Sequence, residues 1–237
     1  MKTTKFAMLL MLSGGLFFAS CKEKDTLGDV TVSVDYWSDQ QAVSMDTIMY
    51  ENAAGNPYSV THLQYYISNF TLHSADLESF LLQDIVLMDI EKNTTLNLLD
   101  VPIGTYNSVS LTLGLDNAHN TSGSLPNTLE NNAMAWPDMM GGGYHFMKFE
   151  GYFRDNLQVQ QGFAVHLGKT GNHVNCTFPI SLVVDGEGAD LSLKMNLNEW
   201  FEHPQIFDFN IDGSSIMADT VALQKIAANG VDVMSEK

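Results

Sequence analysis

Cysteine is scarce in this chain. The 237 residues include only Cys21 and Cys176. Small secreted domains that depend on disulfides contain several pairs, so a disulfide scaffold is excluded as the basis of stability. A packed core must stabilise the fold instead, and a chain of this length with 45% hydrophobic residues can form one.

Basic residues are also few. Lys and Arg number 11 against 28 Asp and Glu, which gives a formal net charge of −17. A chain this acidic repels phosphate backbones, and no basic or basic-aromatic cluster offsets the repulsion. We therefore exclude nucleic acid as a partner.

Short catalytic signatures are absent as well. The sequence has no Gly-x-Ser-x-Gly elbow, no His-Glu-x-x-His helix, no phosphate-binding glycine loop and no Cys-x-x-Cys-His haem attachment. No pair of carboxylates stands out for acid–base catalysis. We expect a protein that is not an enzyme.

The N-terminus has the layout of a secretory signal. Two lysines precede an apolar run over residues 6–18, and small residues lead to Cys21. The run is too short to predict a membrane-spanning helix. Because the cysteine position resembles a bacterial lipobox, we expect residues 1–20 to be a lipoprotein signal peptide. Cys21 would then carry lipid and residues 21–29 would be a tether to the outer membrane, while an ordinary signal peptide with an incidental cysteine is the alternative.

Residues 30–237 show the pattern of one β domain. Alternating or β-branched segments separated by turn signals predict an antiparallel β-sandwich or barrel-like single domain. The residues 178–184 and 191–197 are expected to pair as a hairpin with a longer loop. One short C-terminal helix is predicted over residues 219–228, because an aspartate can cap its start and Asn229-Gly230 can end it. The other predicted strands cover residues 30–36, 63–72, 79–90, 94–99 and 108–115.

A long polar segment interrupts the strands at residues 116–140. Its Asn, Ser, Thr and Pro content has no sustained period, so we expect a loop with a short helical turn near residues 128–133. A loop of this length in a compact domain is usually functional or mobile.

The segment after this loop is predicted to be a β-hairpin with a metal site. If Asp155 and Asn156 form a tight turn, antiparallel pairing places His145 directly opposite His166. Directly opposed Cβ atoms lie about 4.5–5.5 Å apart, so the two imidazoles could share one ion at bonds of about 2.0–2.1 Å. A longer loop would shift the register, and a slip of one residue would put the histidines on opposite faces.

Softer candidate ligands flank the hairpin. Met134, Met139 and Met140 lie in sequence around Trp136, and thioethers favour Cu(I), although loop and core packing is an alternative role for these methionines. His173 could present a further ligand, whereas the nearby Cys176 fits a buried structural thiol better. The remaining histidines are scattered and indicate no site individually: His62, His73, His119 and His203.

Several segments together resemble the MbnP-like family of copper-associated bacterial envelope proteins. They are LQYYISNFTL at residues 63–72, GYHFMKFEGYF at 143–153, FAVHLG at 163–168, EWF at 199–201 and LQKIAANGVDV at 223–233. The resemblance implies a mostly β fold and copper as the cofactor. It also implies that Trp136 is a candidate for oxidation to kynurenine by a di-haem cytochrome c peroxidase-like partner, with His166 as a ligand. The N-terminal strand reads Asp35-Tyr36-Trp37, without the histidine found there in copper-binding members.

Two functions follow from these observations. The first is a lipid-anchored, non-catalytic copper-binding protein of the cell envelope that serves copper acquisition or buffering. A di-haem peroxidase-like protein or a TonB-type receptor encoded beside it would favour this function. The alternative is a cell-surface lipoprotein that binds a protein or glycan through its long loop, without a metal.

Overall fold

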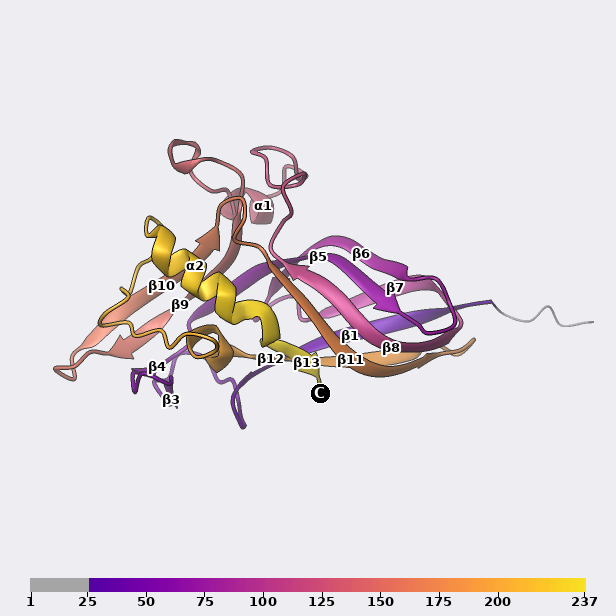
Figure 1. The fold of residues 1–237 in the computed structure, drawn as a ribbon, viewed down its shortest axis with the longest axis horizontal. Coiled ribbons are helices and arrows are strands. Elements are labelled where there is room, and N and C mark those ends of the chain that lie inside the picture. The colour runs from indigo at the N-terminus through magenta and orange to yellow at the C-terminus, as the bar shows by residue number, and fades with distance from the viewer. Residues whose placement is uncertain (1–25) are drawn as a thin grey trace, which may run out of the picture.

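Two β-sheets pack into a sandwich that curves like a half-barrel (Figure 1). The structure is a computed structural model and describes residues 26–237, so the predicted signal peptide and Cys21 lie outside the described residues. The strands are β1 (Leu27–Ser38), β2 (Gln41–Ala42), β3 (Tyr50–Glu51), β4 (Pro57–Tyr58), β5 (His62–His73), β6 (Phe80–Asp89), β7 (Thr95–Pro102), β8 (Gly104–Leu113), β9 (His145–Arg154), β10 (Gln160–Gly168), β11 (Val174–Val184), β12 (Ala189–Asn196) and β13 (Met234–Glu236). The helices are α1 (Leu129–Ala133) and α2 (Thr220–Asn229), with 3-10 turns η1 (Asp138–Met140), η2 (Leu197–Phe201) and η3 (Gly230–Asp232).

The smaller sheet has the order β13-β12-β1-β2, with β7 also paired to β1. The larger sheet has the order β11-β8-β5-β9-β4-β3, with β10 on β9 and β6 on β5. Pairing is antiparallel throughout the named strands except between β1 and β12, which run parallel. The predicted mostly antiparallel β-sandwich is therefore confirmed.

The predicted hairpin of residues 178–184 and 191–197 is wrong. These residues belong to β11 and β12, which lie in different sheets: β11 pairs with β8, whereas β12 pairs with β1 and β13. The turn between them crosses from one sheet to the other. At its end Gly188 has φ +97° and lies so close to the backbone oxygen of Asp29 that a Cβ would be 2.8 Å from it. Only a glycine fits this crossing easily.

An aromatic cluster packs between the larger sheet and the segment that follows β12, within the hydrophobic core. Phe163 stacks on Phe209 with ring centroids 4.6 Å apart, and Tyr58 packs edge-on against Phe201 at 5.7 Å. Each such buried ring contributes about 1.5–3 kcal/mol of hydrophobic stabilisation. The alternating burial of β1 and β11 supplies apolar side chains to the same core, as their period-two sequences predict.

The helix α2 covers the core from the C-terminal part of the chain (Figure 1). Asp219 caps it by accepting from the backbone amides of Val221 and Ala222 at 2.9 and 3.0 Å, and Leu223 and Ile226 are fully buried. The predicted helix and its aspartate cap are thus confirmed. Within residues 26–237 no helix combines the length and apolarity needed to span a bilayer.

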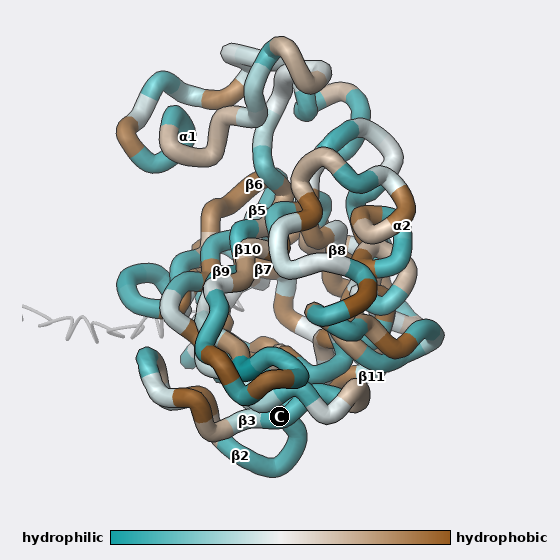
Figure 2. Tube along the Cα trace, turned by 90° about the vertical axis from the view of Figure 1, so that its left-hand side faces the viewer, coloured by the Kyte–Doolittle hydropathy of each residue, from teal (hydrophilic) through white to brown (hydrophobic). Residues whose placement is uncertain are grey.

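The long loop projects beyond the sheets in Figures 1 and 2 and folds back onto the larger sheet. It contains α1, capped by Thr128, where a helical turn was predicted. The Tyr66 hydroxyl of β5 donates to Asn131 Oδ1 at 2.8 Å. Met134 and Trp136 are buried at 0% and 2% exposure. Met134 belongs to the main hydrophobic core, so the loop is anchored on the sheet and positions Trp136 next to β9 and β10.

Candidate metal centre

The loop between β9 and β10 is longer than the predicted two-residue turn. Arg154 pairs with Gln160 rather than with Leu157, which shifts the register by three residues and leaves residues 155–159 as the loop. Asp155 stabilises this loop, because its carboxylate accepts from the amides of Leu157 and Val159, each at 2.9 Å. The predicted direct pairing of His145 with His166 is therefore wrong.

A β-bulge nevertheless brings the two histidines to one face of the sheet. Met147 pairs with Leu167, but the next pair joins His145 to Gly168, so β9 contains one extra residue, Phe146. The extra residue reverses which face His145 occupies. His145 therefore becomes the diagonal neighbour of His166, and the centroids of the two imidazole rings lie 5.1 Å apart at an interplanar angle of 87°.

The His145 ring is buried, and the hydrogen bonding of its Nδ1 is fixed. The residue is 5% exposed, and its Nδ1 donates to the carbonyl of Met134 at 3.0 Å. Burial lowers the pKa of His145 to about 4. The ring is therefore neutral near pH 7, and since Nδ1 carries the proton, Nε2 carries the lone pair. A neutral imidazole with a free lone pair is a metal ligand without prior loss of a proton.

His166 is oriented by a carboxylate. Its Nε2 donates to Glu150 Oε1 at 2.7 Å, and this hydrogen bond lowers the pKa of Glu150. In the neutral ring Nδ1 then carries the lone pair. A histidine ligand held by a carboxylate on its other nitrogen is the usual outer-shell arrangement of protein metal sites. Lys148, directly opposite His166, has its ammonium drawn away to the carbonyl of Ala133.

Trp136 packs against His145. The two ring centroids lie 4.8 Å apart, and the indole Nε1 donates to the carbonyl of Met140 at 3.3 Å. The indole also lies against Gly168, where a Cβ would be 2.5 Å from Cε3 of the ring. The close packing of tryptophan, histidine and glycine explains why position 168 has no side chain.

Among the described residues, the remaining candidates form no hydrogen bond or ring contact with the histidine pair. Met139 is 94% exposed, and Met140 contributes a backbone carbonyl to Trp136. Among the described residues, His173 forms no hydrogen bond or ring contact with the histidine pair, and its Nδ1 is buried without a partner. The Cys176 thiol is buried, donates to the carbonyl of Gly230 over 3.4 Å, and has its pKa raised by burial to about 12. It is a structural thiol, as expected.

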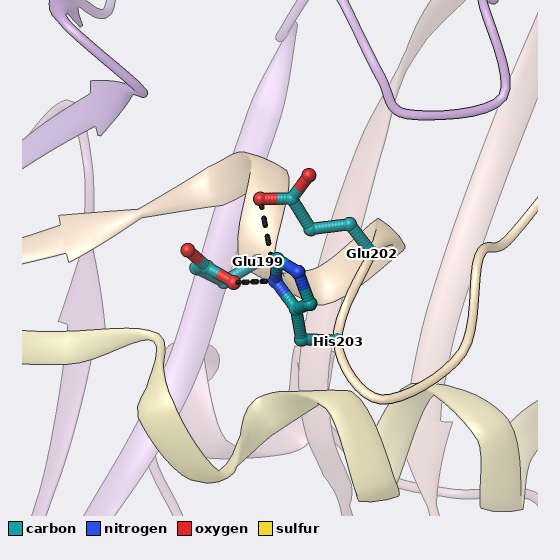
Figure 3. A group of neighbouring side chains, drawn as sticks. All are labelled: Glu199, Glu202 and His203. Atoms are coloured by element: carbon teal, nitrogen blue, oxygen red, sulfur yellow. Dashed lines mark hydrogen bonds and ion pairs between the residues drawn. The ribbon is translucent and has the colours of Figure 1, made fainter.

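The structure also shows a group that sequence reasoning missed. Glu199, Glu202 and His203 place one ligand atom each within 4.8 Å of one another (Figure 3). The hydrogen bond to Glu199 raises the pKa of His203, and burial together with the charge of Glu199 raises the pKa of Glu202. The run Glu-x-x-Glu-His was the available signal in the sequence, but the three side chains meet only because the chain turns tightly at η2.

Comparisons with known proteins agree on one family. A model of the MbnP family matches residues 27–218. The fold is similar to that of MbnP from Methylosinus trichosporium, with a TM-score of 0.50 and 17% identity over 76% of this chain and 79% of that chain. A comparison with curated proteins gives no match. At this identity the structural similarity establishes the fold alone.

Proposed function

This chain belongs to the MbnP family, and we propose that it is a non-catalytic, lipid-anchored copper-binding protein of the cell envelope. The observation that carries the proposal is the pair of His145 and His166, whose rings lie 5.1 Å apart on one face of the larger sheet. Copper acquisition or buffering is the role that such a site would serve.

The donor set suits copper. Each ring has one nitrogen in a protein hydrogen bond, His145 to the Met134 carbonyl and His166 to Glu150, so each has the other nitrogen available. Imidazole nitrogen binds both copper oxidation states. The bound ion would take Nε2 of His145 and Nδ1 of His166, and Glu150 would hold His166 in the tautomer that binding requires.

Copper titration against a competing chelator tests the proposal. We expect the wild type to bind copper stoichiometrically, and His145→Ala and His166→Ala each to weaken binding at least about tenfold, the lower end of the loss for an outer-shell change. His73→Ala is a matched control, because both ring nitrogens of this β5 histidine already bond to Ser79 and Ser110, at 2.8 and 2.7 Å. Equal affinity in all four proteins would overturn the assignment.

The proposed anchor is Cys21. Its sequence context supports lipidation, and two or more acyl chains would hold the domain stably on a membrane. Metabolic labelling with a radiolabelled fatty acid tests this, since the label should enter the wild type and not Cys21→Ser. The expected location is the outer membrane.

Trp136 is the side chain that we expect a redox partner to oxidise. It lies 4.8 Å from the proposed ligand His145, which is where the family resemblance would require an oxidised tryptophan. We therefore propose a di-haem peroxidase-like protein as a partner and a TonB-type receptor as a second one. Coexpression with the neighbouring genes, followed by peptide mass spectrometry of residue 136, tests the first partnership.

A specific observation also supports the alternative function as a binding module. The long loop encloses an open pocket of about 560 Å³, lined in part by Ser122, Asn132, Asp138 and Tyr144. Deleting the loop would remove Met134 and Trp136, both of which contact His145, so point changes are the better test. If the alternative holds, the wild type should bind a glycan array but no stoichiometric copper, and Asn132→Ala or Asp138→Ala should lose the glycan binding.

A further inference from the structure

The group of Glu199, Glu202 and His203 lies on and after η2, apart from the histidine pair on β9 and β10 (Figure 3). Between the glutamates, Trp200 and Phe201 are fully buried. Two anchored aromatic residues thus fix the backbone that carries the ligands, while the His203 side chain remains 63% exposed. The group is both preorganised and accessible from solvent.

The distances within the group suit a shared cation. His203 Nδ1 lies 2.9 Å from Glu199 Oε2 and 3.5 Å from Glu202 Oε1. Ligands bound tetrahedrally at about 2.0–2.2 Å are separated by roughly 3.3–3.6 Å. The imidazole proton now lies between the two carboxylates, so an ion that replaces it needs only small side-chain movements.

The surroundings hold one ligand in place and add negative charge. Asn196 Nδ2 donates to Glu199 Oε1 at 3.4 Å, which leaves Oε2 directed at His203. Asp39 and Asp232 add further negative charge that acts on Glu202. Among the described residues, the only side chain that forms an ion pair with these carboxylates is His203, which is charged only when protonated. A divalent ion would therefore be attracted by more negative charge than His203 can offset.

We propose that Glu199, Glu202 and His203 form a second metal site, for a divalent transition metal of the zinc class. One imidazole nitrogen and two carboxylate oxygens are ligands that Zn²⁺ accepts, and the open side of the exposed imidazole leaves a position for water. This donor set is harder than a pair of imidazoles, so it favours divalent ions over Cu(I). The site is independent of the proposed copper pair.

Isothermal titration of the purified protein with Zn²⁺ tests the site. The wild type should bind one more zinc ion than His203→Ala, or bind zinc at least about tenfold more tightly. Changes to outer-shell residues alone reduce metal affinity ~10–100-fold, so the loss of a ligand should reduce it at least as much. Glu202→Gln is a second variant with nearly the same shape, and it should weaken zinc binding in the same direction.

The matched control is His119→Ala. His119 also contacts a carboxylate at 2.9 Å, that of Asp116, and no second carboxylate within residues 26–237 forms an ion pair with it. Zinc binding by this variant should equal that of the wild type. The proposal is overturned if His203→Ala and Glu202→Gln match the control in stoichiometry and affinity, or if the wild type binds no zinc. Because His145 and His166 are unchanged in every variant, either result leaves the copper proposal untouched.

Discussion

Replacing Gly168 by alanine should damage the histidine centre without touching a ligand. The new Cβ would lie 2.5 Å from Cε3 and 2.6 Å from Cζ3 of Trp136. Carbon atoms in contact prefer about 3.5–4.0 Å, so the overlap is about 1 Å. Trp136 is 2% exposed and its ring is rigid, so it cannot avoid the methyl group by rotating into solvent.

The expected loss of stability is modest but measurable. Overpacking a filled site costs about 1–3 kcal/mol. The lower entropy of the unfolded alanine chain offsets about 0.4–1 kcal/mol of this. We therefore expect the free energy of unfolding to fall by roughly 1–2 kcal/mol, seen as a lower urea midpoint at an unchanged m-value.

Gly162→Ala is the control on the same strand. A Cβ there would approach nothing closer than the backbone oxygen of Gly151, at 4.0 Å. This variant should be neutral or slightly stabilised. Because Trp136 lies 4.8 Å from His145, Gly168→Ala should also weaken copper binding, while Gly162→Ala should not. Equal urea midpoints for the two variants would refute the packing argument. A loss of stability with intact copper affinity would refute the link from Trp136 to His145.

Three further predictions test the outer-shell carboxylate, the thiol and the helix cap. Glu150→Ala should weaken copper binding about 10–100-fold, and Glu150→Gln should weaken it less because the amide oxygen can still accept from His166. Cys176 should resist iodoacetamide at pH 8 unless urea is added. Burial raises the pKa of its thiol to about 12, well above the unfolded value of about 8.5. The thiol's contribution to stability should therefore be present below pH 8.5 and decline as the pH rises toward 12. Asp219→Ala should lower the free energy of unfolding by about 1 kcal/mol in urea titrations, while the exposed Val221→Ala should change it little.

Local signals in the sequence were enough to locate most elements. The period-two pattern of residues 30–36 predicts β1, and the aspartate at position 219 predicts the start of α2. These signals work because alternation and capping depend on neighbours in the chain. The long loop was equally visible as a segment without a period.

Which strands pair could not be obtained from the same signals. β11 and β12 alternate and follow one another across a glycine turn, and so resemble a hairpin. Their separation depends on β1, which lies more than 150 residues earlier and pairs in parallel with β12 from Val30 and Ala189 onward. Partner choice of this kind is decided by the whole core. The group of Glu199, Glu202 and His203 was missed for a similar reason, since the turn of η2 determines whether the three side chains meet.

The histidine pair depends on two departures from regular pairing that compensate each other. The five-residue loop at residues 155–159 shifts the register by three, which alone would place His145 and His166 on opposite faces. The bulge at Phe146 adds one residue to β9 and so restores a common face. The centre therefore depends on the loop and the bulge together. A change that removed only one of them, such as shortening the loop by one residue, would separate the histidines while leaving both in the sequence.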